Sequence, residues 1–331
     1  MTADPRPRFA ISLPLTGVDA RTAVDTARHA ADHGYDAAWC SEVQGPDAFT
    51  TLGALAVTTD LDLGVAVVPA LTRSAAVLGM TAVSLAELSG GRFTLGIGAS
   101  SEVIVEGWAG QSFDRPLTAV AETVEALRPV LRGERSTHEG EIVRMRGYRP
   151  HAPPVGGRVP LVVAALNPRS CRLVGSLGVD GIALNQVAPR HVTQVLDEVA
   201  AGGDGLDEGF RVVTRMFCAV TDDVPAMREV VRRRFAPYLA TTPYNRFYRW
   251  IGYEEEAEGV LAAGGDRDAM RAAFSDRVID DLFLLGPAGS IAERLAAHRE
   301  AGVTDLVIQP LGAGRDAAEH TLWSIADAYL R

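Results

Sequence analysis

The stretch GRFTLGIGASSEVIVEGWAG, residues 91–110, combines small residues and carboxylates in a spacing that could bind a ligand. Two glycines, Gly96 and Gly98, stand one residue apart at the end of an apolar run. Such a pair can form a phosphate-binding turn, as in dinucleotide folds, or the end of a barrel strand that a ligand approaches closely. The dinucleotide fingerprint requires a third glycine where Ser101 stands, and it normally follows the first strand. We therefore favour a strand end.

The composition excludes several other chemistries. All 32 basic residues are arginine, so Schiff-base aldolases, pyridoxal enzymes and P-loop hydrolases, which need a lysine amine, are excluded in their usual form. A net charge of −10 argues against general nucleic-acid binding, which needs a basic field. The three cysteines are far apart, and no CxxC or HExxH motif is present, so we expect no metal site.

The N-terminal segment MTADPRPRFAISLPL, residues 1–15, lacks the cationic and long apolar regions of a signal peptide. No apolar stretch of the sequence approaches the length of about 20 residues that spans a bilayer. We expect a cytoplasmic protein with no membrane segment.

Short aliphatic runs alternate along the chain with longer Ala-rich amphipathic stretches, which is the pattern of repeated βα units. The expected strands are 9–15, 35–42, 61–68, 92–100, 160–166, 180–185, 211–220 and 304–310. The expected helices are 19–34, 47–59, 74–91, 116–132, stretches starting near 168 and 189, 286–302 and 314–330. Eight such units can form an open doubly wound sheet or a closed barrel, and the count of eight favours a (β/α)8 TIM barrel.

We expect one domain, residues 1–331, with two excursions from the barrel. The Gly- and Pro-containing segment 133–159 predicts a loop or hairpin insertion, and the polar segment 223–280 predicts a helical insertion. The run DLFLLG, 281–286, has a weaker strand pattern than TDLVIQP, which we take as the eighth strand.

Several motifs together resemble one known family. They are LAELSGGRFTLGIGASSEVIVEGWAG with FDRPL shortly after, GYDAAWCSE, LGVAVVPALTRSAAVLGMTAVSL, PLVVAALNP and GPAGSIAERLAAHREAGVTDLVI. The chain resembles the bacterial luciferase-like superfamily of flavin and deazaflavin oxidoreductases, and most of all its coenzyme F420-dependent branch. The resemblance covers the chain except the helical insertion.

The resemblance implies a cofactor ring at the C-terminal mouth of the barrel. In relatives, a cis peptide bond in the third strand backs the ring, and the matching bond here is Ala66–Val67. Gly98, Ala99 and Ser100 match the strand end that lines the ring edge. Relatives hold the phosphate of the cofactor tail over the fifth and sixth βα loops, which correspond to Leu166, Asn167, Asp180, Gly181 and Asn185. Arg73, Arg169 and Arg190 are the nearby basic residues, although each could equally be a helix-capping or surface ion-pair residue.

The catalytic residues are less well marked. Some relatives carry an acid followed by a histidine at the end of the second strand, and here the pair is Glu42 and Val43. We therefore take Glu42 as the general acid or base, with Glu102 behind it, although a glutamate at a strand end can simply accept backbone N–H bonds. Trp108 is a substrate platform or a core or lid residue.

Three functions follow from this interpretation. The first is a coenzyme F420-dependent oxidoreductase that transfers a hydride between C5 of the deazaflavin and a small, mainly apolar organic molecule. The second is a two-component monooxygenase that uses FMN, and the third is a non-catalytic cofactor-binding protein of the same fold. Family resemblance also implies a homodimer, and no nucleic-acid or membrane partner is expected.

Overall fold

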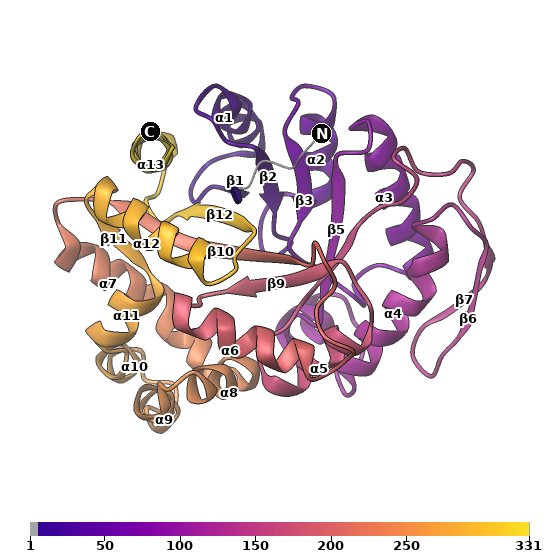
Figure 1. Cartoon of the computed structure of the whole chain (residues 1–331). Helices are drawn as coiled ribbons and strands as arrows, with labels where there is room; N and C mark the ends of the chain where they lie inside the picture. The colour runs from indigo at the N-terminus through magenta and orange to yellow at the C-terminus, as the bar shows by residue number, and fades with distance from the viewer. Residues whose placement is uncertain (1–5, 331) are drawn as a thin grey trace.

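The computed structural model describes residues 6–330, so the first five residues of the segment examined for a signal peptide lie outside it. Its centre is a closed ring of parallel strands (Figure 1). The ring consists of β1 (Arg8–Leu13), β2 (Ala37–Cys40), β3 (Asp62–Val65), β5 (Phe93–Gly98), β8 (Leu161–Ala164), β9 (Gly181–Asn185), β10 (Arg211–Val220) and β12 (Asp305–Pro310). Because β10 pairs with both β9 and β12, the ring closes, and the expected (β/α)8 barrel is confirmed.

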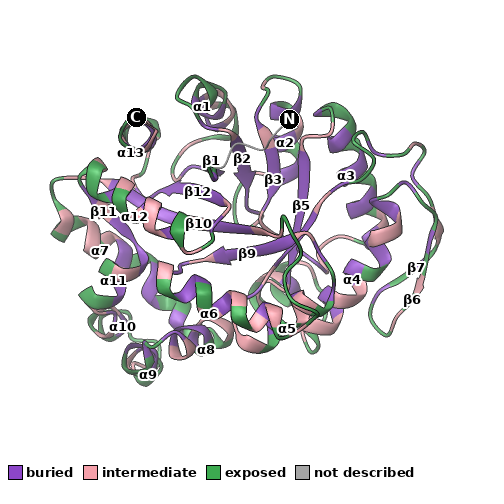
Figure 2. Ribbon diagram, in the orientation of Figure 1, coloured by how far each residue is buried: buried purple, intermediate pink, exposed green. Residues whose placement is uncertain are grey.

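Helices cover the outside of the ring. They are α1 (Ala20–Asp32), α2 (Ala48–Ala56), α3 (Ala75–Leu88), α4 (Pro116–Val130), α5 (Pro168–Ser176), α6 (Pro189–Ala200), α12 (Ala288–Glu300) and α13 (Arg315–Tyr329). Figure 2 shows the strands buried and the outward faces of these helices exposed, as their amphipathic pattern predicts. Asp19 starts α1, because its carboxylate accepts a hydrogen bond from the backbone N–H of Thr22 at 3.0 Å.

The segment 133–159 holds the antiparallel pair β6 (Ser136–Glu139) and β7 (Arg144–Tyr148), which lies outside the barrel. The polar segment after β10 forms α7 (Val224–Phe235), η2 (Ala236–Ala240), α8 (Thr242–Trp250), α9 (Glu254–Ala262), α10 (Arg267–Ala273) and α11 (Asp276–Leu282). Figure 1 shows these helices grouped on one side of the barrel. Two short strands extend the sheet at the carboxyl ends of ring strands. β4 (Val68–Pro69) pairs with the end of β5, and β11 (Leu284–Gly286) pairs with the end of β10.

Side chains that point toward the barrel axis form a small separate core around Trp39. It contains Ala10, Ala37, Trp39, Val162, Ala183, Val213 and Val307. Gly64 makes room for the indole, since a Cβ on Gly64 would lie 2.4 Å from the Trp39 ring. One bulky ring therefore fills the middle of the barrel, and small residues surround it.

Below this core, at the amino ends of the strands, Arg211 and Asp305 close the barrel. Asp305 is fully buried, and Arg211 donates to both of its carboxylate oxygens. Arg211 also reaches across the interior to the Thr94 hydroxyl at 2.8 Å and lies over the Trp39 ring. This end of the barrel is sealed by a hydrogen-bonded ion pair.

Candidate functional site

The carboxyl ends of β3, β5 and β8 form a floor of small residues at the opposite end of the barrel. Ala66, Val67 and Ala164 pack on the Trp39 core, yet each is only partly buried. Gly98 fits between them, since a Cβ there would lie 2.9 Å from Val67 Cγ2 and 3.2 Å from Ala164 Cβ. The Ala66–Val67 peptide bond is cis, as expected from the resemblance. An apolar floor that solvent still reaches has the shape and polarity that a planar redox ring requires.

The backbone turns sharply after β5. Ser100 has a φ of 65°, in the left-handed region, and Ala99 and Ser100 are both partly buried beside the floor. The chain then enters η1 (Val103–Trp108), a short π-helix of the kind often found near functional sites. Glu102 precedes η1 and is exposed, and Trp108 ends it with 54% of its surface exposed. The two residues therefore belong to a loop beside the barrel mouth rather than to the barrel itself.

Glu42 lies two residues beyond β2 and is held by Arg73. The guanidinium group donates to both carboxylate oxygens, from Nε at 3.2 Å and from Nη2 at 2.8 Å, and it also binds Asp47. These hydrogen bonds, first the one to Glu42, raise the pKa of Arg73 above its usual value. The Glu42 backbone N–H donates to Val67 O at 3.4 Å. Glu42 and Arg73 thus form one ion pair beside the floor.

The start of α5 already satisfies most of its own backbone donors. The Asn167 side chain accepts from the Ser170 N–H at 3.1 Å, and the Ser170 hydroxyl accepts from the N–H groups of Leu166 and Asn167. Pro168 has no N–H, so Arg169 supplies the remaining donor of the first turn. This helix start can contact an anion only through Arg169 and the Asn167 amide.

The structure separates Asp180 and Gly181 from the other proposed tail-binding residues, and the Asp180 carboxylate accepts from the Leu161 N–H at 2.8 Å. Gly181 is the first residue of β9 and Asn185 is its last, so about 13 Å of strand lies between them. Only Asn185 lies at the carboxyl end of the strand. The sequence motif DGIALN does not reveal which of its ends faces the ligand, so the prediction includes both ends. Arg190, at the start of α6, is bound by Asp281 at 2.8 Å and by the Tyr253 hydroxyl.

Arg215 lies at the mouth as well, although no sequence motif marked it as a site residue. Arg215, Val213 and Arg211 alternate along β10 and therefore face the same barrel axis. The Arg215 Nε donates to Asn185 Oδ1 at 3.2 Å, and its guanidinium group lies 5.1 Å from the centre of the Phe217 ring. The available signal was an arginine in the middle of a mainly apolar strand.

Helices of the insertion add further polar groups to this place. The Tyr244 hydroxyl, from α8, accepts a hydrogen bond from Asn185 Nδ2 at 3.0 Å. Arg234, near the end of α7, lies 5.9 Å from the Phe217 ring centre and donates to Thr16 Oγ1, in the loop after β1, at 3.1 Å. The insertion therefore lies against the β10 side of the mouth.

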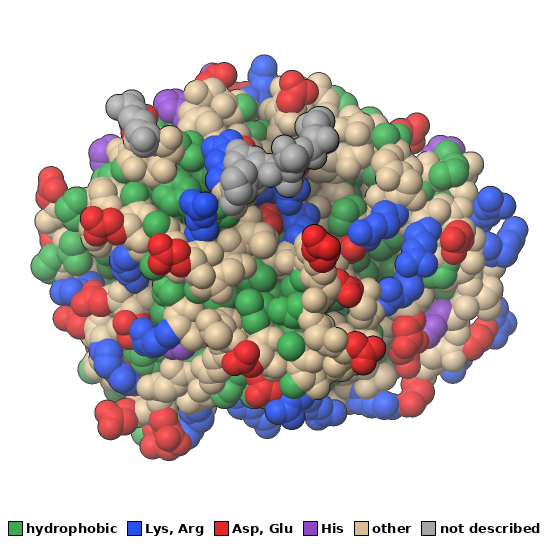
Figure 3. All heavy atoms as spheres, in the orientation of Figure 1, with side chains coloured by type: hydrophobic (Ala, Val, Ile, Leu, Met, Phe, Trp, Pro, Cys, Tyr) green, Lys and Arg blue, Asp and Glu red, His purple; other side chains and the backbone are tan. Residues whose placement is uncertain are grey.

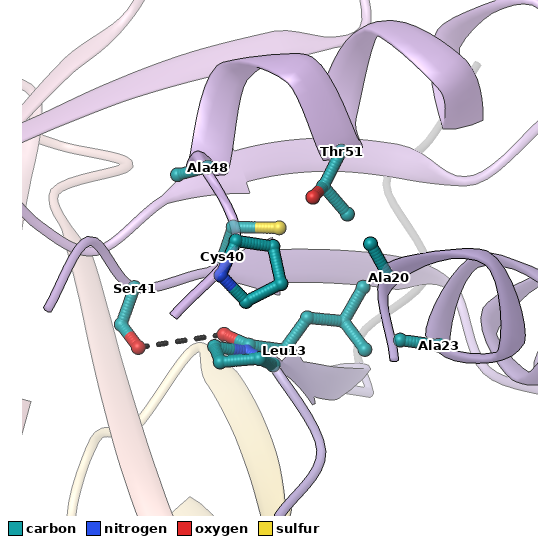
Figure 4. Close-up of a pocket in the computed structure, with 9 residues that line it drawn as sticks. Leu13, Ala20, Ala23, Cys40, Ser41, Ala48 and Thr51 are labelled. Atoms are coloured by element: carbon teal, nitrogen blue, oxygen red, sulfur yellow. Dashed lines mark hydrogen bonds between the residues drawn. The ribbon is translucent and has the colours of Figure 1, made fainter. Parts of the chain in front are cut away.

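A small internal void lies outside the barrel ring, between α1, α2 and the ends of β1 and β2 (Figure 4). Leu13, Ala20 and Cys40 line it, and burial raises the pKa of the Cys40 thiol. Its volume of about 10 Å³ holds at most one water molecule, so it cannot bind a cofactor.

Two further observations concern the described residues, 6–330. None of their helices is long and apolar enough to cross a bilayer, and no group of three or more His, Cys, Asp or Glu side chains is arranged to hold a metal ion. On the face shown in Figure 3, basic and acidic side chains are intermixed.

Known structures share this fold. A coenzyme F420-dependent tetrahydromethanopterin reductase from Methanopyrus kandleri superposes with a TM-score of 0.80 at 20% identity, covering 98% of this chain and 99% of the other. An F420-dependent secondary alcohol dehydrogenase bound to an F420–acetone adduct also gives 0.80, at 15% identity over 98% and 99%. The oxygenating constituent of 3,6-diketocamphane monooxygenase from Pseudomonas putida, in complex with FMN, gives 0.69 at 16% identity over 98% of each chain.

Sequence comparison agrees with the structural one. A 5,10-methylenetetrahydromethanopterin reductase from Archaeoglobus fulgidus is 29% identical over 303 residues, which cover 86% of this chain and 88% of the relative. The profile of the family described as luciferase-like monooxygenase matches residues 8–305, from the start of β1 to the start of β12. The barrel, the floor at its mouth and this match agree, and the chain belongs to the luciferase-like monooxygenase family.

Proposed function

We propose that this protein is a coenzyme F420-dependent oxidoreductase acting on a small, mainly apolar organic substrate. The floor of Ala66, Val67, Gly98 and Ala164 carries the proposal, because it is apolar, lined by small residues and partly exposed at the end of a closed barrel. Similar proteins whose names include this cofactor support the choice. When bound, the deazaflavin would accept or supply a hydride at C5.

In this proposal the floor holds one face of the ring and keeps water from it. Ala99 and Ser100 would line the ring edge, where small side chains let the backbone come close. Leu166, Asn167 and Asn185 would lie along the cofactor tail. Arg169, whose side chain is exposed, would be the basic residue beside that tail. Arg73 and Arg190 would act indirectly, since their guanidinium groups already bind Glu42 and Asp281.

Glu42 would handle the proton that accompanies hydride transfer, oriented by Arg73. Glu102 and Trp108 would act from the η1 loop, which borders the mouth and exposes an indole that could cover the substrate. A Glu42→Gln variant tests the first role: turnover with F420 should fall about 100-fold or more while F420 affinity changes little. Glu87→Gln, an exposed carboxylate on the outer helix α3, is the control.

Cofactor choice is tested by measuring affinities for coenzyme F420 and FMN side by side. We expect F420 to bind at least about tenfold more tightly, and Ala164→Trp, which fills the floor, to abolish that binding without unfolding the protein. Ala262→Trp, at the end of α9 in the insertion and away from the barrel, is the matched control. Tighter binding of FMN would refute the proposal.

The alternative function is an FMN-dependent monooxygenase supplied with reduced flavin by a partner reductase. Its support is the shared fold with an FMN-bound monooxygenase at a TM-score of 0.69. Consumption of O₂ that depends on reduced FMN and an organic substrate would establish this function in place of the first.

We also propose that the protein is a homodimer. Neighbouring helices α2 and α3 expose Val57, Val77, Met80 and Leu88, which are between 44% and 64% exposed. A second copy that covered these side chains would remove apolar surface from water. Sedimentation should show a dimer that Met80→Arg converts to a monomer.

A further inference from the structure

Arg215 differs from other arginines inside the fold because its terminal nitrogens have no protein acceptor among residues 6–330. Arg211 binds the carboxylate of Asp305, and Arg294 donates to the carbonyl oxygens of Phe283 and Asp281 at 2.7 and 2.9 Å. Arg215 instead donates only from Nε, and to a neutral amide. Buried charges are normally paired because removing them from water is unfavourable. The pairing of Arg215 is therefore incomplete.

A second guanidinium group lies near the same aromatic ring. The guanidinium groups of Arg215 and Arg234 lie 5.1 and 5.9 Å from the centre of the same Phe217 ring. No carboxylate within residues 6–330 forms an ion pair with either arginine. Burial lowers the pKa of Arg215, Tyr244 and Tyr238 oppose part of that shift, and the positive charge of Arg234 adds a smaller lowering. Two guanidinium groups that lie over one ring and have no carboxylate partner favour the binding of an anion.

Tyr244 adds a neutral donor at the same place. Its hydroxyl oxygen accepts from Asn185, and its own proton finds no acceptor in the described part of the chain. Burial raises the pKa of Tyr244, so the hydroxyl keeps that proton at neutral pH. Asn185 thus holds Arg215 through Oδ1 and Tyr244 through Nδ2, which fixes the two donors relative to each other.

We infer that Arg215, Arg234 and Tyr244 form a subsite that binds an anionic oxygen group, a carboxylate or a phosphate, of the substrate. Guanidinium groups bind such anions through two parallel hydrogen bonds, which suits a chain whose basic residues are all arginine. The substrate would place its apolar part over the floor and its charged end toward β10. Assigning the anion to the substrate depends on the proposed function, whereas the anion site itself does not.

The first experiment uses benzoate, inorganic phosphate and the neutral benzyl alcohol as probes of the cofactor-free protein. Calorimetry at constant ionic strength should show benzoate binding about tenfold or more tightly than benzyl alcohol. Arg215→Gln and Arg234→Gln should each remove that preference. Arg233→Gln deletes the same charge from an exposed neighbouring position on α7 and should keep it. Equal binding of the acid and the alcohol, or an equal loss in Arg233→Gln, would overturn the inference.

Arg234 is exposed, so its variant tests the subsite even if Arg215→Gln folds poorly. The second experiment separates the two sources of an anion. Arg215→Gln should bind coenzyme F420 as tightly as the wild type does. If the variant loses affinity for F420 but not for its chromophore without the phosphate tail, the anion belongs to the cofactor and the substrate assignment fails. Preference for FMN over F420 would refute the proposed function and leave the benzoate result standing.

Discussion

The two ends of the barrel use arginine from the same strand in opposite ways. Arg211, at the amino end of β10, binds a fully buried carboxylate and a hydroxyl across the interior. Arg215, four residues later on the same face, has a neutral amide as its partner and a second arginine nearby. The charge of Arg211 is compensated by a carboxylate of the protein, whereas the charge of Arg215 is not.

The difference matches the division of labour in (β/α)8 barrels, where the amino end supports stability and the carboxyl end carries ligands. At the amino end, Asp305 accepts from Arg211 and from the Thr304 hydroxyl, so the buried charge is satisfied. At the carboxyl end, Arg215 has no carboxylate partner within residues 6–330. An arginine inside the fold that lacks a carboxylate partner, such as Arg215, is therefore a better guide to a binding site than a paired arginine at the rim, such as Arg73 or Arg190.

We expect the greatest loss of stability when the Arg211–Asp305 ion pair is broken. Among residues 6–330, the Asp305 carboxylate is the only one hydrogen-bonded to the partly buried Arg211 guanidinium group, so Asp305→Asn leaves that charge uncompensated. We expect the free energy of unfolding to fall by about 3–5 kcal/mol. Urea unfolding measures it.

Asp62→Asn provides the control, because Asp62 also lies at the amino end but is 43% exposed and pairs with Arg8 at the surface. That change should reduce stability by less than about 1 kcal/mol. Equal effects of the two substitutions would show that Asp305 does not hold Arg211 in place.

The second prediction concerns acid. His191 lies in the first turn of α6 beside the barrel mouth, and burial, with a smaller contribution from Arg190, lowers its pKa from 6.5 to about 4. The unfolded chain therefore binds a proton that the folded chain rejects, so stability is full above about pH 6.5 and falls as the pH drops toward 4. A shift of this size corresponds to about 3 kcal/mol.

Urea unfolding at about pH 7.5 and about pH 4.5 would measure that loss. His191→Gln should flatten the pH dependence, whereas His29→Gln, on the exposed face of α1, should leave it unchanged. If His191→Gln kept the full pH dependence, other groups would be responsible for the acid sensitivity.

The third prediction concerns the layer between the two ends. Gly64→Ala places a methyl group against the Trp39 ring, which also contacts Arg211 from the side of the amino end. The indole must shift, and we expect a loss of about 1–3 kcal/mol, typical of overpacked cores. Gly53→Ala, in α2 with open space around its Cα, should not destabilise the protein. Near-ultraviolet circular dichroism would report the movement of Trp39 directly.

The sequence predicted the barrel well because each strand and helix carries its own local pattern. The family resemblance named Ala66, Val67 and Gly98, which lie in the floor, but not Ala164. Pairings between distant residues were not visible. Arg73 and Arg190 were selected as cations, but their partners Glu42 and Asp281 lie 31 and 91 positions away.

Arg215 is a second residue whose partners could not be predicted from the sequence. The alternation in RVVTRMFCAV places both arginines of β10 on one face, but nothing in that pattern tells which one meets a carboxylate. Arg234 and Tyr244 lie in a segment correctly expected to be helical. Their approach to the mouth depends on how the insertion folds back toward Thr16 and Asn185, which is a tertiary contact.

Replacing Arg215 with an apolar residue should change stability very little. Arg215→Leu removes a hydrogen bond to Asn185 and a contact with the Phe217 ring, each worth about 0.5–1.5 kcal/mol. It also removes a poorly solvated charge and its repulsion from Arg234, which offsets those losses. We therefore expect stability in urea to change by less than about 1 kcal/mol, in contrast to the Asp305 variant. A loss as large as that of Asp305→Asn would mean that Arg215 is a structural residue and that the two ends of the barrel are alike.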